Sequence, residues 1–288
     1  MFIDKLIKKI TTLQNPTVIG LDPDISQFPD NLKNLDIQEA LESFNFSIID
    51  KVCDIIPAVK LQSAYYEMYG LEGITAFKNT IDYAKSKGMI VIADVKRNDI
   101  GSTAKAYSKA YLGKAFDVDC ITVNPYLGSD GIVPFLEDCK EYNKGLFILA
   151  KTSNPSSGEF QNITTADGKP VYVHVAEKIA TWGSELIGEH GYSSIGAVVG
   201  ATYPEEIKVL REKMKHVFFL IPGYGAQGGK AEDIRLALDN NNLGALINSS
   251  RGLMYAYKSN LWKDKFKSEE FANATRAEAI KMKDELWR

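Results

Sequence analysis

Cysteine and histidine are scarce in this sequence of 288 residues, and neither forms a motif. Cys53, Cys120 and Cys139 are far apart and show no C-x-x-C spacing. This pattern argues against a disulfide framework and predicts a reducing, cytoplasmic location. The 3 histidines are equally dispersed, so a zinc site would require the fold to gather them.

The sequence also lacks an excess of one charge and a long apolar segment. Its 34 Lys and Arg residues nearly balance its 37 Asp and Glu residues, so no general affinity for nucleic acid or an anionic membrane is expected. No apolar run has the length of a membrane span, and no Pro/Ser-rich linker divides the chain. Residues 2–10 have the spacing of an amphipathic helix, which we expect to pack on its own domain rather than on a membrane. These absences favour one globular domain over residues 1–288.

Short apolar runs recur along the chain without the alternation of half-buried strands. Runs of this kind, rich in β-branched residues, suit strands that are buried on both faces. Strands are predicted at 17–22, 56–62, 89–96, 119–124, 146–151, 195–200, 217–223 and 244–250. Helical periodicity marks 37–53, 65–87, 129–141, 171–190, 204–214 and 230–240, and a last helix from Ser268 toward Trp287. This alternation predicts an α/β fold, a (β/α)8 TIM barrel, with a doubly wound sheet as the alternative.

One long stretch, residues 152–170, has no clear periodicity and follows the fifth predicted strand. It is too long for a plain connector between two elements. We therefore expect a loop over the active face of the barrel.

A glycine-rich loop follows the seventh predicted strand, where Gly223, Gly225 and Gly228 have the G-x-G-x-x-G spacing of dinucleotide-binding proteins. In a dinucleotide fold this fingerprint opens the first βαβ unit, and an acidic residue ends the next strand. Here only one strand remains, and it ends in NSSRG, which leaves open an NADP-like interpretation through Arg251. Barrels often build a phosphate site from the loops after strands 7 and 8, where Arg251 would add a charge-assisted hydrogen bond. The loop therefore predicts a phosphate site.

Charged residues end the third predicted strand with the spacing Asp-x-Lys-x-x-Asp, formed by Asp94, Lys96 and Asp99. Residues two apart on a strand share a face, and the carboxyl ends of barrel strands face the active site. Carboxylates keep a neighbouring ammonium charged, which disfavours a Schiff base and favours a proton donor beside a developing carbanion. A solvated charge cluster is the alternative, although burying charges on an apolar strand costs free energy. Asp22 and Lys60, at two other strand ends, extend the predicted network to Lys60–Asp94–Lys96–Asp99.

Seven segments of the sequence together resemble the orotidine 5'-phosphate decarboxylases, in particular their longer bacterial branch, sometimes called type 2. These segments are GLDPD, PAVKLQ, ADVKRNDIGSTA, KTSNPSSG, VVGATYP, PGYGAQGG and SSRG. The resemblance runs from the first predicted strand to the last. Asp-x-Lys-x-x-Asp alone is shared with sister enzymes that act on sugar phosphates, whereas its combination with PGYGAQGG is specific. The resemblance implies a homodimeric lyase of pyrimidine biosynthesis that converts orotidine 5'-monophosphate to UMP without a metal or cofactor.

The resemblance also implies a role for each matching residue. Lys96 would protonate C6 of the pyrimidine, Asp94 and a partner subunit's Asp99 would flank it, and Lys60 would complete the network. Asp94 would either repel the departing carboxylate or position Lys96, and both readings stay open. The implied substrate-binding residues are Asp22 and Lys60 at the ribose hydroxyls, Thr103 across the dimer at the ribose, Ser153 at the pyrimidine, Pro222, Gly223 and Gln227 in the loop over base and phosphate, and Ser250 with Arg251 at the phosphate.

Two other functions stay open at this point. A sugar-phosphate lyase of the same superfamily, such as a 3-keto-gulonate 6-phosphate decarboxylase, would use a similar barrel and phosphate site but would need Mg²⁺ for an enediolate. A non-catalytic sensor would bind UMP-like ligands without turnover. Activity on orotidine 5'-monophosphate in EDTA separates both from the decarboxylase.

Overall fold

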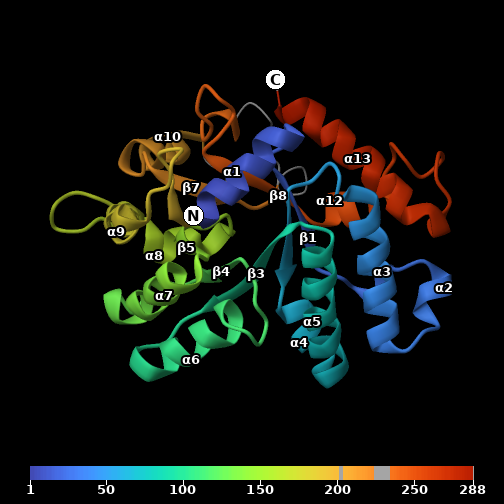
Figure 1. Ribbon diagram of the computed structural model, residues 1–288. Coiled ribbons are helices and arrows are strands. Elements are labelled where there is room, and N and C mark those ends of the chain that lie inside the picture. Colours follow the sequence, from blue (N-terminus) through green and yellow to red (C-terminus); the bar gives the residue numbers. More distant parts are fainter. Residues whose placement is uncertain (201–203, 224–233, 288) are drawn as a thin grey trace. The chain divides into compact units, whose positions relative to one another are not determined.

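The strands of the chain form a closed parallel barrel in the order in which they occur in the sequence (Figure 1). The computed structural model describes residues 1–200, 204–223 and 234–287. The strands are β1 (Thr17–Leu21), β2 (Ala58–Gln62), β3 (Ile90–Arg97), β4 (Cys120–Val123), β5 (Gly145–Lys151), β6 (Ser193–Val199), β7 (Val217–Ile221) and β8 (Ala245–Ser249). The predicted TIM barrel is confirmed, with small shifts at the strand ends. Because the sheet is closed, the doubly wound alternative is excluded.

The strands are buried over most of their length, as their unalternated sequences predict, although β3 ends in an exposed Lys96 and a half-buried Arg97. In β1, β6, β7 and β8 every residue is buried. A parallel sheet covered by helices buries both faces, and β-branched side chains suit that environment.

Helices alternate with the strands. The longer ones are α1 (Phe2–Leu13), α3 (Ile37–Val52), α5 (Gly70–Ser86), α6 (Gly101–Leu112), α7 (Ser129–Tyr142), α9 (Val171–Trp182), α10 (Pro204–Lys213) and α13 (Phe271–Leu286). Shorter helices and 3₁₀ turns are η1 (Ile25–Gln27), α2 (Asp30–Lys33), α4 (Ala64–Glu67), η2 (Pro155–Ser157), α8 (Gly158–Gln161), η3 (Ser184–Leu186), α12 (Arg251–Met254), η4 (Ala256–Lys258) and η5 (Ser268–Glu270).

The chain divides into two compact units, and each has its own helical layer. The first unit comprises residues 1–8 and 96–247, and the second comprises residues 9–95 and 248–288. In the second unit α3 packs between α5 and α13 (Figure 1). The ring of Phe44 in α3 stacks on Phe28, with 4.1 Å between centroids, and on Phe271 of α13, with 4.8 Å. Stacked rings of this kind add about 0.5–1.5 kcal/mol per pair to the burial of their area.

A buried polar group in the second unit fixes the end of β1. Tyr66 is fully buried, and its hydroxyl donates to the backbone oxygen of Leu21 at 3.1 Å. The amide of Asn45 donates to the same hydroxyl at 3.0 Å and to Thr80 at 3.2 Å. The strand end immediately before Asp22 is therefore held by hydrogen bonds from the helical layer.

A partly buried arginine in the first unit binds the backbone at the beginning of β7. Arg211 of α10 packs over the ring of Phe219, with 3.7 Å from the guanidinium carbon to the ring centroid, and burial lowers its pKa to about 10. Its guanidinium donates to the backbone oxygens of Met214, Val217, Ala237 and Gly244. A planar group with several donors suits this bridging of carbonyls from separate segments.

Two predicted helices are wrong in their extent. The helix predicted at 65–87 is divided into α4 and α5, and Gly70 begins α5 with φ of 62°, a conformation that side chains rarely adopt. The helix predicted at 171–190 ends at Trp182. A Cβ on the next residue, Gly183, would lie 2.7 Å from the Ser193 hydroxyl, so this close approach requires glycine.

The stretch 152–170 is more ordered than predicted. It contains η2, α8 and a bridge between Thr164 and Pro170, so it is not an irregular loop throughout. The helix predicted at 230–240 lies in part outside the described residues.

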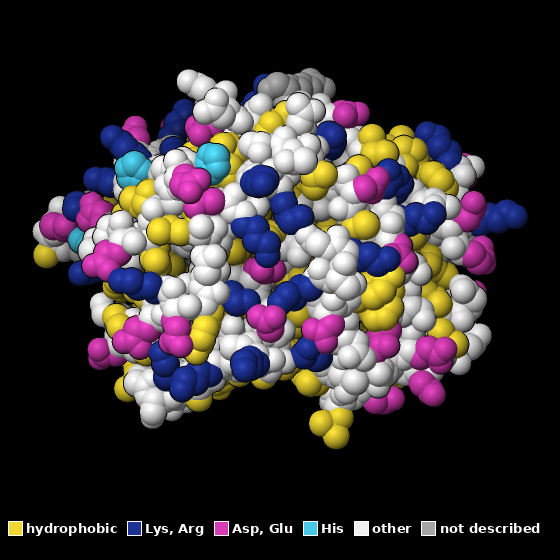
Figure 2. Space-filling view, viewed as in Figure 1, with side chains coloured by type: hydrophobic (Ala, Val, Ile, Leu, Met, Phe, Trp, Pro, Cys, Tyr) yellow, Lys and Arg dark blue, Asp and Glu magenta, His cyan; other side chains and the backbone are white. Residues whose placement is uncertain are grey.

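The surface carries both charges. On the face shown in Figure 2, Lys and Arg side chains are interspersed with Asp and Glu, so this face presents no field of a single sign. Among the described residues, no helix has both the length and the apolar character needed to cross a bilayer.

Candidate active site

A buried lysine of β2, Lys60, lies between two carboxylates of the second unit. One carboxylate follows β1 and the other belongs to β3. The Lys60 ammonium donates to Asp94 Oδ2 at 3.1 Å and to Asp22 Oδ1 at 3.5 Å. The Gln62 amide donates to the same Asp94 oxygen at 3.1 Å. These four residues, Asp22, Lys60, Gln62 and Asp94, are called the β1–β3 cluster below. The strand register places Gln62 opposite Asp94, which explains why a residue at that position reaches its carboxylate.

The β1–β3 cluster keeps its ammonium charged. Burial lowers the pKa of Lys60, but the carboxylates of Asp22 and Asp94 outweigh that effect and hold the pKa above its usual range. Lys60 is 5% exposed and Asp94 is 8% exposed, so solvent screens their attraction little. The cluster therefore presents fixed donors and acceptors of the kind that orient hydroxyl groups of a ligand. Three residues predicted from separate strand ends, Asp22, Lys60 and Asp94, are brought together.

Ser250 and Arg251 follow β8 in the same unit. Ser250 accepts a hydrogen bond from the Asn248 amide at 3.3 Å, and Arg251 begins α12 with an exposed side chain. A Cβ on Gly20 of β1 would lie 1.9 Å from the Ser250 hydroxyl, so the glycine of the GLDPD segment makes room for Ser250. The arginine is exposed at a strand end, as a group that grips a ligand phosphate needs to be.

Lys96 lies at the end of β3 in the first unit, in an unusual backbone conformation. Its φ is 43°, and its backbone N–H donates to the Thr122 hydroxyl at 2.9 Å. A non-glycine residue with positive φ costs about 1–3 kcal/mol, and such strain concentrates at functional sites. The strand therefore bends out of regular geometry at Lys96. That Lys96 shares a face with Asp94, and is linked to Asp99, stays a prediction.

Asp99 and Thr103 lie beyond this strand. Asp99 occupies the short turn before α6, and its carboxylate accepts the N–H of Ile100 at 2.8 Å. Thr103 is exposed in the first turn of α6. Arg97, between them and Lys96 in the sequence, donates to the Tyr111 hydroxyl at 2.6 Å and so joins α6 to the strand.

Ser153 follows β5 and is packed against the end of β6. A Cβ on Gly200 would lie 2.9 Å from the backbone nitrogen of Ser153 and 3.0 Å from its Cα and Cβ. Only glycine fits this close approach of two backbones. Gly200 thus has a role that its sequence position alone would assign to ordinary packing.

The glycine-rich loop is described only at its beginning. Pro222 and Gly223 follow β7, and Gly223 has φ of 88°, which favours glycine. Gln227, Gly225 and Gly228 lie outside the described residues.

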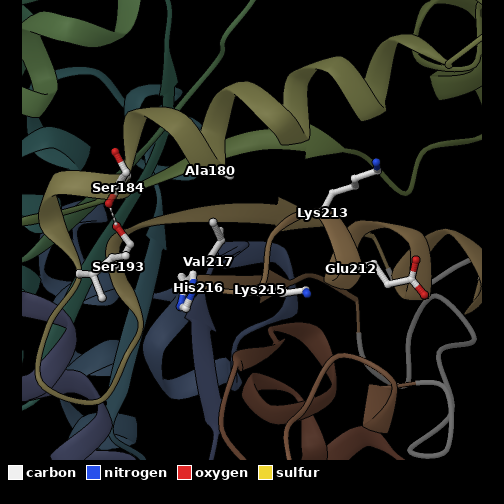
Figure 3. Close-up of a pocket in the computed structure, with 10 residues that line it drawn as sticks. Ala180, Ser184, Ser193, Glu212, Lys213, Lys215, His216 and Val217 are labelled. Carbon is white, nitrogen blue, oxygen red and sulfur yellow. Dashed lines mark hydrogen bonds between the residues drawn. The ribbon is translucent and has the colours of Figure 1, made fainter.

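A pocket of about 210 Å³ lies at the opposite, amino-terminal ends of β6 and β7 (Figure 3). Two of its serines are hydrogen-bonded within the protein: Ser193 donates to the backbone of Gly183 at 2.7 Å, and Ser184 donates to the backbone of Thr181 at 2.8 Å. The predicted site residues of the first unit follow the carboxyl ends of their strands, so this pocket is separate from them. Within the described ranges, no group of three or more His, Cys, Asp and Glu side chains is arranged to hold a metal ion.

Sequence reasoning missed several residues that shape these strand ends. Gln62 was hidden in the quoted PAVKLQ segment, and its pairing with Asp94 depends on the register. Lys151 and Glu206 form an ion pair at 3.7 Å between segments that are distant in the sequence. A lysine directly after an apolar run, as in FILAK, was the available signal.

Comparison with known proteins gives consistent matches over the whole chain. Residues 18–260 match the model of the family described as "Orotidine 5'-phosphate decarboxylase / HUMPS family". Orotidine 5'-phosphate decarboxylases from Caldicellulosiruptor saccharolyticus and Clostridium acetobutylicum are each 44% identical, covering 97% of both chains and 99% of both chains, respectively. The solved structure of Leishmania donovani OMP decarboxylase is 27% identical, covers 98% of each chain and superposes with a TM-score of 0.75.

Proposed function

Because the chain belongs to the orotidine 5'-phosphate decarboxylase / HUMPS family, we propose that it decarboxylates orotidine 5'-monophosphate to UMP in pyrimidine biosynthesis. The observation that carries this proposal is the end-to-end match at 44% identity to named decarboxylases. The β1–β3 cluster supports it independently, since a charged lysine held between carboxylates suits a polar, hydroxyl-bearing ligand.

In the proposed reaction the bond between C6 and the carboxylate breaks, and its electron pair stays on C6. The Lys96 ammonium stabilises this charge as it forms and then transfers a proton to C6. Asp94 lies beside the departing carboxylate, and Lys60 holds Asp94 in place. Lys96 shares its positive φ with four other described non-glycine residues, Gln14, Asp117, Asn143 and Asn242, but it alone among them lies at the end of β3 beside the Asp-x-Lys-x-x-Asp unit, which supports this role. No step in this scheme uses a metal or a cofactor.

The substrate is held at three places in this proposal. Asp22 and Lys60 bind ribose hydroxyls, and Ser153 binds the pyrimidine. Pro222, Gly223, Gln227, Ser250 and Arg251 surround the phosphate. Phosphate binding is remote from C6, yet its free energy favours closure of the site and exclusion of water. A charge-assisted hydrogen bond contributes about 1.5–3 kcal/mol, so Arg251→Ala should lower kcat/KM by roughly ten- to a hundredfold.

The functional unit in this proposal is a homodimer in which Asp99 and Thr103 reach the site of the partner subunit. Large apolar side chains are exposed in the same unit: Ile100 is 51% exposed and Tyr126 is 82% exposed. In the proposed dimer these side chains would be covered by the partner subunit. Mixing inactive Lys96→Ala and Asp99→Ala subunits should restore activity, because one site of each mixed dimer then has both residues. Mixed dimers without any activity would contradict a shared site.

We also propose that residues 1–288 act as one catalytic domain in the reducing cytoplasm. Cys53, Cys120 and Cys139 are free thiols, which suits that compartment. A single cooperative unfolding transition supports one domain, and two separable transitions would contradict it.

The decisive assay follows the absorbance of orotidine 5'-monophosphate with purified protein in EDTA. Turnover that survives EDTA is the expected result. A protein that is inactive on this substrate but decarboxylates 3-keto-gulonate 6-phosphate with Mg²⁺ would be the sister lyase instead. Binding of UMP without any turnover would identify a sensor.

A further inference from the structure

A second buried lysine lies at the end of β5, two residues before Ser153. Lys151 is 1% exposed, and its ammonium donates to the Ser157 hydroxyl at 3.1 Å. The Glu206 carboxylate of α10 lies 3.7 Å from the same nitrogen, and the ring centroid of Tyr172 in α9 lies 5.7 Å away. One ammonium therefore joins the end of β5 to η2, α9 and α10.

Stability alone does not explain this lysine. Removing an ammonium from water costs free energy that a buried ion pair repays only in part, and apolar replacements of such pairs are often neutral or stabilising. The carboxylate partner is itself affected: burial raises the pKa of Glu206, and the Lys151 ammonium opposes that rise. What an ammonium supplies that an apolar side chain lacks is direction, because its N–H groups select defined acceptors.

The segment that Lys151 anchors carries Ser153. Just after Lys151, the N–H of Thr152 donates to the Gln161 side chain at 2.9 Å, and the Gln161 amide donates back to the Thr152 hydroxyl at 2.7 Å. These two hydrogen bonds join the two ends of the segment 152–161. On the other side, the N–H of Gly200 donates to the backbone oxygen of Lys151 at 2.8 Å, and Gly200 leaves no space beside Ser153. Ser153 is thus held between two anchors that share Lys151.

We propose that Lys151, with Glu206 as its counter-charge, is a positioning residue that sets Ser153 for recognition of the pyrimidine ring. The ammonium acts through η2: it fixes Ser157, and through it the turn that begins at Asn154, the residue directly after Ser153. This inference rests on the proposed function, because Ser153 binds the pyrimidine only if the substrate is a pyrimidine nucleotide.

The test compares two ligands that share the ribose phosphate and differ in the base. Lys151→Met keeps the length and the apolar stem of the side chain but removes the ammonium. Isothermal titration calorimetry should show affinity for UMP reduced by about 10- to 100-fold, the scale expected for a small misplacement of a binding group. Affinity for ribose 5-phosphate, which has no base, should stay within about twofold of wild type. In turnover of orotidine 5'-monophosphate, KM should rise more than kcat falls.

A matched control is Lys144→Met, at the opposite end of β5. Lys144 also forms an ion pair, with Asp117 at 2.7 Å, and its side chain is mostly buried. This variant should bind both ligands as wild type does. Equal losses for UMP and ribose 5-phosphate in Lys151→Met, or no loss for either, would overturn the inference.

Two further measurements keep the inference testable. If Lys151→Met does not fold, Ser157→Ala removes the hydroxyl partner alone and should weaken UMP binding selectively; unchanged UMP binding would then overturn the inference. Turnover of orotidine 5'-monophosphate by wild type is measured first. An inactive wild type contradicts the proposed function, whereas an active wild type with a non-selective variant contradicts only the role of Lys151.

Discussion

Lys60, in the middle of β2, and Lys151, the last residue of β5, are both buried, yet their surroundings differ. Lys60 lies between two carboxylates, at 3.1 and 3.5 Å, whereas the described partners of Lys151 include a hydroxyl at 3.1 Å and a carboxylate at 3.7 Å. The carboxylate partners of Lys60 are themselves expected to touch the substrate. The partners of Lys151 are the Ser157 hydroxyl of η2 and the Glu206 carboxylate of α10, and η2 begins two residues after Ser153, which we propose contacts the pyrimidine. In our proposal, Lys60 sets the charge beside the substrate, and Lys151 sets the position of the segment that carries Ser153.

The largest effect is expected from removing the charge of Lys60. Lys60→Met leaves Asp22 and Asp94 close together without a counter-charge, and breaking a buried pair in this way costs about 3–5 kcal/mol. Urea denaturation should show this loss, and kcat/KM should fall by about two to three orders of magnitude or more. The double variant Lys60→Met/Asp94→Asn should regain stability but not activity. If Lys60→Met were as stable as wild type, the charge of Lys60 would not be needed between its two carboxylates, and the contrast between the surroundings of Lys60 and Lys151 would have no energetic meaning.

A smaller effect is expected from adding a methyl group beside Ser153, in the segment that Lys151 anchors. The Cβ in Gly200→Ala would meet the backbone of Ser153 at 2.9 Å, so one of the two segments must move. We expect a cost of about 1–3 kcal/mol and a selective loss of UMP affinity. The control is Gly158→Ala in the same loop, where the nearest side-chain atom lies at 3.5 Å, an ordinary contact. If both variants behave alike, the close approach at Ser153 is unimportant for binding.

Alkaline pH should separate Lys60 from ordinary lysines. The pKa of Lys60 is raised in the folded protein, so its stabilising contribution is complete below the unfolded value of 10.5 and is lost as pH rises through the folded pKa. The difference in unfolding free energy between wild type and Lys60→Met should be constant to about pH 10 and then fall by up to about 1.4 kcal/mol per pH unit. A difference that already declines between pH 8 and 9 would contradict the two-carboxylate environment.

The smallest effect is expected on the exposed side of residues 152–170. Hydrogen bonds from the Thr165 hydroxyl, the Lys169 backbone and His174 lower the pKa of Asp167 to about 2. Its contribution to stability is therefore present above the unfolded value of 3.8 and is lost as pH falls through about 2. NMR titration of this carboxyl measures the shift directly. Asp167→Asn should leave UMP affinity unchanged, because this end of the segment lies beyond the anchor at Lys151, and weaker UMP binding would extend the positioning role to the whole segment.

The barrel and half of the candidate site could be predicted from the sequence, for a physical reason. Strand ends in a barrel converge, so a polar residue directly after an apolar run, such as Asp22 or Lys60, is placed by topology alone. Lys151 also follows an apolar run, but its role could not be predicted from the sequence, because its partners Ser157 and Glu206 look like ordinary loop and helix residues there. Distances between segments so far apart depend on packing that no local pattern encodes.

The glycines also show that a local sequence pattern does not predict contacts between distant segments. Gly223 was identified from its motif, and its positive φ agrees with a loop that needs glycine. Gly200 and Gly20 stand in the quoted segments VVGATYP and GLDPD, but their need for glycine comes from neighbours on other strands or loops, Ser153 and Ser250.

The most direct test of the account measures decarboxylation of orotidine 5'-monophosphate and binding of UMP by the same preparation of Lys96→Ala. If the ammonium of this residue supplies the proton and stabilises the developing charge, the rate should fall by roughly a thousandfold or more while UMP affinity changes only a few-fold. Turnover close to that of wild type, with UMP still bound, would contradict it.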